Sequence, residues 1–366
     1  MKIGITIDTS ISIKNSRLNQ NLIFLGDSMK KAGVDVIFLT NKNINPRQSN
    51  ITAAYIIHAN HYMAYTESGD MPKGLSMLIE GGFSIDESTI KAYRTTTQNF
   101  KHIKLCPNHQ INLDVLDLLT EHKGGKASCR RKFDEVWTWN FLENTATYLS
   151  AVYGCEIKKI PYLWDTRFIN RELDILKKKG KCPKYKASRD GEVCIFEKNI
   201  MPSANCLIPL SICENLNKKR PEIIKSLNIT NCQKLKQNAR FSDIIDQLSL
   251  KKQKKIFLNN EWNNVEALAR WGKVVILYNQ NESLSSKHLE LMHLEIPILH
   301  NCEEIKEYGY HYNIKTLKNA TNQLEYALTM HNENADYYKG QARECIRKFS
   351  PDNTKNINQI QSILGV

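Results

Sequence analysis

The feature that most constrains the fold is an alternation between short, continuous apolar runs and longer segments with apolar residues at helical spacing. The run 3–8 is followed by a polar loop, 9–16, and by a helix-patterned stretch, 17–33, that stops at Gly33. A second apolar run, 34–40, comes next. Unbroken apolar runs separated by helices are typical of parallel strands buried on both faces. The sequence therefore predicts an α/β fold with a parallel sheet.

The alternation continues and then starts again. Further strands of the first half are expected at 53–59, 75–80, 102–106 and 135–139, and helices at 86–97, 112–121 and 141–153, before 156–169 closes this half. In the second half, strands are expected at 191–197, 254–259 and 273–279, and helices at 207–219 and 263–272. Two such halves predict two Rossmann-like domains facing each other across a cleft, with the ligand at the carboxyl ends of the strands.

We expect four parts along the chain. Residues 1–165 form a Rossmann-like acceptor-side domain, and 166–190 form a basic interdomain segment. Residues 191–348 form a Rossmann-like donor domain, and 349–366 form a C-terminal helix that returns toward the first domain. A chain of 366 residues with 41% hydrophobic residues can bury two such cores.

Compartment and metal content are also constrained by the sequence. No run of about 18 apolar residues is present, and the N-terminus lacks a signal-peptide pattern, so a cytoplasmic protein without a transmembrane segment is expected. The ten cysteines are scattered and form no Cys-x-x-Cys pair. Reduced thiols are expected, and no zinc site.

The net charge of +13 raises the question of nucleic acid. The basic residues concentrate in 177–189, 217–221 and 251–255, and no arginine-rich helix, zinc finger or aromatic-interleaved motif accompanies them. Specific nucleic-acid recognition is therefore not predicted. A basic surface suits anionic sugar nucleotides, acidic glycans or peripheral contact with a phospholipid face, and it equally suits a solvated surface with no partner.

Several motifs are absent. There is no Gly-x-Gly-x-x-Gly, and Thr120 stands where a phosphate loop at 124–128 would need its first glycine. No Gly-x-Ser-x-Gly elbow is present, which disfavours an esterase. The chain also lacks Asp-x-Asp, which disfavours a metal-dependent glycosyltransferase and favours a ligand held by a helix dipole and side chains.

The stretch 282–301 combines a loop, an amphipathic helix and a buried strand. Glu282 falls at the helix entrance and Glu290 about two turns further on. A helix N-terminus suits a diphosphate, and a carboxylate accepts hydrogen bonds from ribose or sugar hydroxyls. The alternative is an ordinary surface helix with two solvated acids.

Segments in the same order along nearly the whole chain resemble an uncharacterised bacterial and viral family, a domain of unknown function regarded as glycosyltransferases of the GT-B fold. They are RLNQNLIFL (17–25), MLIEGG (77–82), VWTWNFLENTATYL (136–149), IPYLWDTRFI (160–169), 195–216 and 282–312. The chain departs from the family at His293, Leu294 and Glu295, where small residues or glycine are usual, and at Ser286, where asparagine is usual. The resemblance implies transfer of a sugar from a nucleotide-diphosphate sugar to a glycan or other hydroxyl acceptor, with no further cofactor.

Candidate site residues lie at strand ends and helix starts. An inverting enzyme needs a base for the acceptor hydroxyl, and Glu80 and Asp8 are the candidates. The donor-side candidates are Glu282, Ser283, Ser285, Ser286, Glu290, Lys198, Asn199, His300 and Asn301. The acceptor-side candidates are Arg17, Asn19, Gln20, His58 and His61. The competing interpretations are helix capping for the serines, solvated loop or turn residues at 198 and 199, and a satisfied structural histidine at 300.

Two other function classes stay open. One is a sugar-nucleotide epimerase-like enzyme on the same architecture. The other is a non-catalytic two-lobed protein that binds a small ligand or nucleic acid. The nucleotide base, donor sugar, acceptor, linkage, stereochemistry and oligomeric state do not follow from the sequence.

Overall fold

The computed structural model divides into two compact units. The first comprises Met1–Phe168 together with Phe349–Val366, and the second comprises Ile169–Lys348. The residues described are 1–13, 16–41, 62–64, 71–120, 131–181, 184–188, 190–197, 199, 203–260, 265, 273–281 and 283–366. The predicted strand at 53–59 and most of the predicted helix at 263–272 fall outside these ranges.

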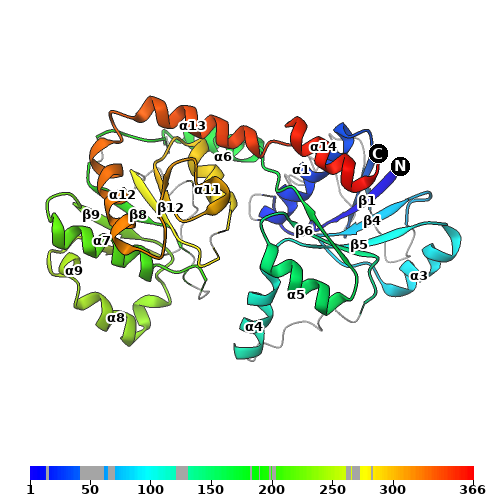
Figure 1. Cartoon of the computed structure of the whole chain (residues 1–366), viewed down its shortest axis with the longest axis horizontal. Coiled ribbons are helices and arrows are strands. Elements are labelled where there is room, and N and C mark those ends of the chain that lie inside the picture. The colour runs from blue at the N-terminus through cyan, green and yellow to red at the C-terminus, as the bar shows by residue number, and fades with distance from the viewer. Residues whose placement is uncertain are drawn as a thin grey trace. The chain divides into compact units, whose positions relative to one another are not determined.

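The first unit is a parallel sheet with helices (Figure 1). In spatial order its strands are β3 (Tyr62–Ala64), β2 (Asp35–Thr40), β1 (Lys2–Ile7), β4 (Met77–Glu80), β5 (Lys101–Cys106), β6 (Glu135–Trp139) and β7 (Glu156–Ile160). Its helices are α1 (Arg17–Lys31), α3 (Glu87–Thr96), α4 (Gln110–Thr120), α5 (Glu143–Tyr153) and α14 (Thr354–Leu364), and α6 (Arg167–Lys178) begins at its boundary.

The second unit repeats this strand order. Its sheet runs β10 (Ile256–Leu258), β9 (Ser226–Ile229), β8 (Glu192–Ile195), β11 (Val274–Leu277), β12 (Ile298–His300) and β13 (Tyr310–His311), all parallel. The helices are α7 (Leu207–Lys219), α8 (Ala239–Asp246), α9 (Ser249–Lys252), α11 (Ser286–His293), α12 (Leu317–Met330) and α13 (Ala335–Lys348), with short 3-10 turns at Leu235–Gln237 and Glu303–Ile305. Helix α7 packs on α12, and α11 packs on α13.

Strand order creates a reversal point in each sheet. Moving from β1 to β2 takes the chain one way across the sheet, and moving from β4 to β5 takes it the other way. The same reversal separates β8 from β11. Because crossovers between parallel strands are right-handed, the helices on either side of the reversal cover opposite faces, and a crevice opens at the carboxyl ends of the two central strands. The predicted pair of Rossmann-like sheets is confirmed, and each has one such crevice.

The sequence cues for the elements act as expected where they can be inspected. Ser16 caps α1 by accepting from the Asn19 backbone N–H at 3.2 Å, and Gly33 follows the helix with φ of +88°. Gly154 closes α5 with φ of +62°. The cores are formed by continuous apolar strands; all four residues of β4 and all four of β11 are buried.

Part of the predicted basic interdomain segment is helical. Helix α6 buries Phe168, Leu173 and Leu176 along one side and carries Lys177 and Lys178 in its last turn. The apolar residues recur at helical spacing, so packing and not the net charge decides the conformation of this stretch. The 3-10 turn at Leu235–Gln237 and the strand β9 were also not predicted.

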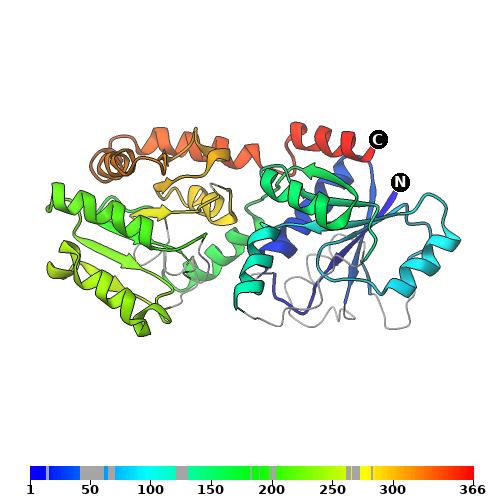
Figure 2. The ribbon, with the colours of Figure 1, turned by 60° about the horizontal axis from the view of Figure 1, so that its bottom comes forward.

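The C-terminal segment completes the first unit. The Trp164 backbone N–H donates to the Phe349 carbonyl at 2.8 Å, and Lys31 on α1 pairs with Asp352. Helix α14 packs against α1 and β7, and both views show the two helices side by side (Figures 1 and 2). The first sheet is thus covered by residues from both ends of the chain.

The helices that the structure describes are short and amphipathic. The 15 residues of α1 fall below the roughly 20 that a bilayer crossing needs. Within the described ranges, no helix has both the length and the apolar character to cross a membrane.

The cysteines of the described part carry no disulfide. Eight are present there as thiols, and all but Cys155 are buried. Burial raises the pKa of Cys106 to about 11 and that of Cys206 to about 12, so both are protonated at neutral pH. Cys129 and Cys182 lie outside the described ranges.

Gly82 provides a test of the close approach between β1 and β4. A Cβ at this position would lie 2.4 Å from the Asp8 backbone nitrogen and 2.6 Å from Ile7 Cα. We expect Gly82→Ala to destabilise the protein by about 1–3 kcal/mol, because a backbone must shift. Urea unfolding measures the change.

The matched control is Gly340→Ala. Gly340 lies inside α13, and a Cβ there meets nothing within 4 Å. Alanine should stabilise this helix by roughly 0.5–1 kcal/mol. Equal effects of the two substitutions would contradict the close approach.

Candidate functional site

Side chains at the carboxyl edge of the second sheet connect its central strands. Glu197 follows β8, and its Oε1 accepts from the Tyr278 backbone N–H, just after β11, at 3.0 Å. A buried carboxylate thus satisfies a strand-end N–H at the reversal point. Sequence reasoning missed Glu197, although it is the first polar residue after an apolar run.

Amide side chains extend this frame. Asn301, after β12, accepts from the Asn279 N–H at 3.0 Å and donates to the Asn279 carbonyl at 2.7 Å. Asn279 in turn donates to Ser283 Oγ at 3.2 Å. Asn199 has φ of +54°, accepts from the Cys206 N–H at 2.8 Å and donates to the Thr230 carbonyl at 3.0 Å.

These amides hold the loops at the strand ends. The predicted residues Ser283, Asn301 and Asn199 therefore lie at one edge, and the structure adds Asn279 to them. Asn301 and Ser283 are both buried. In this structure they position the backbone of the edge, which is a supporting contribution to any ligand site there.

Helix α11 starts at the same edge. Ser285 is its N-cap, and the Ser285 N–H donates to His288 Nδ1 at 3.1 Å. Ser286 is the first helical residue and is half-buried. Glu290, one turn further along, is 4% exposed. The capping interpretation of Ser285 is confirmed, and the free N–H groups of the first turn supply a partial positive charge.

Lys287 was missed by the sequence reasoning. It is the second residue of α11, is half-buried, and donates from Nζ to the Phe196 carbonyl at the end of β8. Its side chain thus crosses from the helix that follows β11 to the end of β8. A lysine in the first turn of a helix that starts at the reversal point was the signal that could have identified it.

Two buried histidines lie behind this edge and are neutral. His300 Nε2 donates to the Tyr308 carbonyl at 2.8 Å, while its Nδ1 accepts from the Cys302 N–H at 3.2 Å. Because both Nδ1 atoms accept backbone protons, neither ring can take a second proton without losing a bond. Burial lowers the pKa of His288 to about 3, helped by repulsion from His300, and burial lowers that of His300 to about 4.

His300 corrects one expectation. The sequence placed it at the end of a strand, facing the ligand, but the ring is 0% exposed and bonded to the backbone of the following loop. The residues 302–308 fold back over the strand end, which the local pattern does not reveal. The structural alternative applies to this histidine.

The edge of the first sheet centres on Asp8, half-buried after β1. Its Oδ1 accepts from the Ser10 N–H at 2.9 Å, from Ser10 Oγ and from Asn41 Nδ2 at 2.6 Å. The loop at Gly82 follows β4 and approaches the Asp8 backbone closely. Asp8 therefore lies at the reversal point of this sheet, in a polar surrounding.

Glu80 has a different environment. Its carboxylate is fully buried and accepts two bonds from Arg131 at 2.9 and 3.0 Å, one from His102 Nε2 at 3.0 Å and one from the Ile85 N–H at 2.9 Å. Burial acts to raise its pKa, but the bonds from His102, Ile85 and Arg131 outweigh it, so the pKa lies below the ordinary value. This geometry favours a structural ion pair over the predicted base.

The acceptor-side candidates on α1 are also supporting residues. Asn19 Nδ2 donates to the Asp8 carbonyl at 2.7 Å, and Gln20 Nε2 donates to the Ile13 carbonyl at 2.8 Å. Both side chains are buried and hold the loop after β1, so they point to the backbone and not to solvent. Arg17 is the first residue of α1 and is half-buried.

Four predicted site residues lie outside the described residues. They are His58, His61, Lys198 and Glu282. Their assignments stay predictions.

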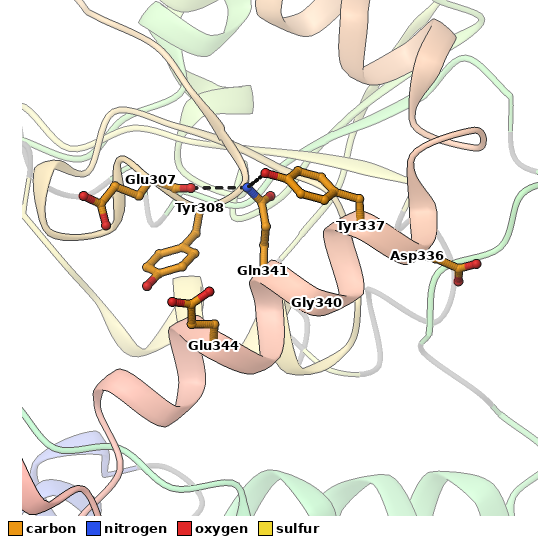
Figure 3. A pocket seen from close by; sticks show the side chains of 7 residues that line it. All are labelled: Glu307, Tyr308, Asp336, Tyr337, Gly340, Gln341 and Glu344. Carbon is orange, nitrogen blue, oxygen red and sulfur yellow. Dashed lines mark hydrogen bonds between the residues drawn. The ribbon is translucent and has the colours of Figure 1, made fainter.

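A separate shallow pocket of about 500 Å³ lies on α13 (Figure 3). Its lining includes Glu307, Tyr308, Asp336, Tyr337, Gln341 and Glu344. Gln341 Nε2 donates to the Glu307 carbonyl at 3.3 Å and to the Tyr337 hydroxyl at 3.4 Å (Figure 3). Three carboxylates would repel a diphosphate, so this pocket is not a candidate for an anionic ligand.

Comparison with solved structures places the architecture in a known class. The chain is similar to a glycosyltransferase from Rickettsia africae ESF-5, with 12% identity, a TM-score of 0.55, and coverage of 99% of this chain and 98% of the other. It is similar to Anabaena HepE in complex with UDP and glucose, at 11% identity and a TM-score of 0.54 over 100% and 99% of the chains. S. aureus TarM, in complex with fondaparinux, alpha-GlcNAc-glycerol and UDP, matches at 10% identity and a TM-score of 0.55 over 100% of both.

These likenesses show that the chain has the GT-B fold of glycosyltransferases. The sequence itself assigns the family: the chain belongs to the family described as "Protein of unknown function (DUF2827)", which matches residues 3–364. No curated protein matches the sequence.

The neutral histidines predict a loss of stability in mild acid. The pKa of each folded-state imidazole lies below the 6.5 of an ordinary histidine, so the unfolded chain takes up protons first as the pH falls. Stability that is complete above about pH 6.5 should decline toward pH 4, by on the order of 1–2 kcal/mol for each histidine at pH 5. Urea unfolding at pH 7 and pH 5 measures this loss.

His288→Asn keeps an acceptor near the Nδ1 position but does not titrate, so it should flatten the pH dependence. The control is His293→Asn, which changes a half-buried histidine of the same helix that contacts Asn170. This control should retain the slope of the parent. A parent protein with equal stability at both pH values would contradict the neutral buried pair.

Proposed function

We propose that this chain is a GT-B glycosyltransferase that moves a sugar from a nucleotide-diphosphate sugar to a hydroxyl group of a glycan or other acceptor, without a metal ion. The observation that carries the proposal is the edge of the second sheet, where α11 begins at the reversal point between β8 and β11. Support comes from the fold, which the chain shares with glycosyltransferases whose structures contain UDP. Fold alone is an analogy, so the site residues must be tested.

The second unit supplies the donor side of the proposal. The first turn of α11 would receive the diphosphate, because its N–H groups and dipole favour an anion. Glu290 would accept hydrogen bonds from the ribose hydroxyls, and Glu282 from the donor sugar. Lys198 would lie near the diphosphate as a counter-charge.

The first unit supplies the acceptor side. In an inverting reaction the acceptor oxygen attacks C1 of the sugar, the bond between C1 and the diphosphate oxygen breaks, and the nucleoside diphosphate leaves with the bonding electrons. The acceptor proton must go to a base. We assign this base to Asp8 because Glu80 is held by Arg131 and His102. A retaining enzyme would need no such base.

Nucleotide binding is the first test. The protein is heated with UDP, GDP, dTDP or CMP, and with their common sugar conjugates, in the presence of EDTA. A ligand at about 100 times its dissociation constant adds about 2.7 kcal/mol of stability and raises the melting temperature. Glu290→Gln should lose this stabilisation and keep the melting temperature of the ligand-free parent.

The control for Glu290 is Glu307→Gln, which changes an exposed carboxylate on the same unit. This variant should respond to nucleotides like the parent. Silence across the panel, together with stabilisation by oligonucleotides that weakens with salt, would replace the proposal with a nucleic-acid-binding protein.

Asp8→Asn separates binding from turnover. Asparagine retains an acceptor for the Ser10 and Asn41 bonds but cannot take a proton. We expect nucleotide binding to be unchanged and transfer to fall by roughly 10²–10⁴-fold. Transfer is followed by release of nucleoside diphosphate with the acceptor that supports turnover. Full transfer in Asp8→Asn would exclude Asp8 as base and favour a retaining route.

A further inference from the structure

A cation from α11 reaches the point where the second sheet reverses. Lys287 Nζ donates to the carbonyl of Phe196, the residue that follows β8, and α11 itself follows β11. The two strands are hydrogen-bonded neighbours, with Ile276 opposite Ile195 in the last register pair. The ammonium group therefore lies where the carboxyl ends of the two central strands meet.

This position is unfavourable for a lysine in the absence of an anion. A cation in the first turn of a helix faces the positive end of the helix dipole, which costs about 0.3–1 kcal/mol at an exposed site. The carbonyl of Phe196 accepts a hydrogen bond but carries no negative charge to balance the ammonium. A ligand with two phosphate groups would reverse the sign of this interaction.

The neighbouring groups keep the local charge dependent on this lysine. His288 and His300 are held neutral by their backbone bonds, as described above. The Glu197 carboxylate, one residue beyond Phe196, is engaged by the Tyr278 N–H. Helix dipole and Lys287 thus act together at this edge.

We propose that Lys287 binds the diphosphate of the donor and stabilises the charge that develops on the leaving group. This inference rests on the proposed glycosyltransferase function and assigns it a residue outside the glutamate pair. As the bond from C1 to the diphosphate oxygen breaks, its electrons pass to that oxygen. Lys287 Nζ then donates a charge-assisted hydrogen bond to the phosphate and keeps its proton. No divalent cation is required for this contact.

The contact predicts a specific pattern of affinity. Hydrogen bonds between charged groups are worth about 1.5–3 kcal/mol, which corresponds to a ten- to hundredfold change in the dissociation constant. Lys287→Met should weaken binding of the best nucleoside diphosphate by that factor. Binding of the matching nucleoside, which has no phosphate, should not change.

The experiment is titration calorimetry of the full chain with the best nucleoside diphosphate, the matching nucleoside and inorganic pyrophosphate, in EDTA. Lys287→Arg should retain most of the affinity for the diphosphate because it retains the charge. The control is Lys318→Met, since Lys318 is also the second residue of its helix, α12, and is exposed. Melting temperatures without ligand show whether each variant is folded.

The outcomes separate the two proposals. A parent protein that binds neither nucleotides nor pyrophosphate overturns the proposed function and this inference with it. A parent that binds nucleoside diphosphates, with unchanged affinity in Lys287→Met, overturns the assignment of Lys287 alone. Equal weakening of nucleoside and nucleoside diphosphate would make Lys287 a brace between α11 and β8, and would also overturn it.

Discussion

The right-handed crossover between parallel strands is the constraint on which the rest of this structure depends. It leaves a chain that reverses direction across its sheet with one edge where two central strands end without a helix over them. This chain meets that condition twice, between β1 and β4 and between β8 and β11. Polar residues that would be costly within the strands are placed at these two edges.

The two edges differ in charge. In the first unit Asp8 remains among neutral polar partners, whereas the charge of Glu80 is balanced by Arg131. In the second unit the edge carries the amino end of α11 and Lys287, with neutral histidines behind it. One edge is suited to accept a proton, and the other to hold an anion. The proposed reaction needs both kinds of chemistry.

Much of the fold could be predicted because buried parallel strands are continuous in their apolar pattern. Strand β6 and helix α7 begin and end where the sequence indicated. Strand β9 was missed because its four residues, Ser226–Ile229, include the polar Asn228 and give too short a run. Helix α6 was missed because the lysines of this stretch received more weight than the spacing of its apolar residues.

The site was less predictable than the fold. Position in the sequence indicated which residues end strands, and Asp8, Asn199, Ser283 and Asn301 do lie at the expected edges. It could not indicate which way a side chain turns or what covers it. His300 is buried under a later loop and Glu80 is paired with an arginine 51 residues away, and both facts depend on tertiary packing.

The return of the C-terminal segment to the first unit has a consequence for how the protein is made. Residues 349–366 leave the ribosome last, yet they bond to Trp164 and pack on α1. The second unit is contiguous and has its complete sequence before that segment emerges. During synthesis, which runs at about 5–20 residues per second, the first unit therefore waits for its final helix with the face of α1 uncovered. The order of completion along the nascent chain is thus the reverse of the order of the two units in the sequence.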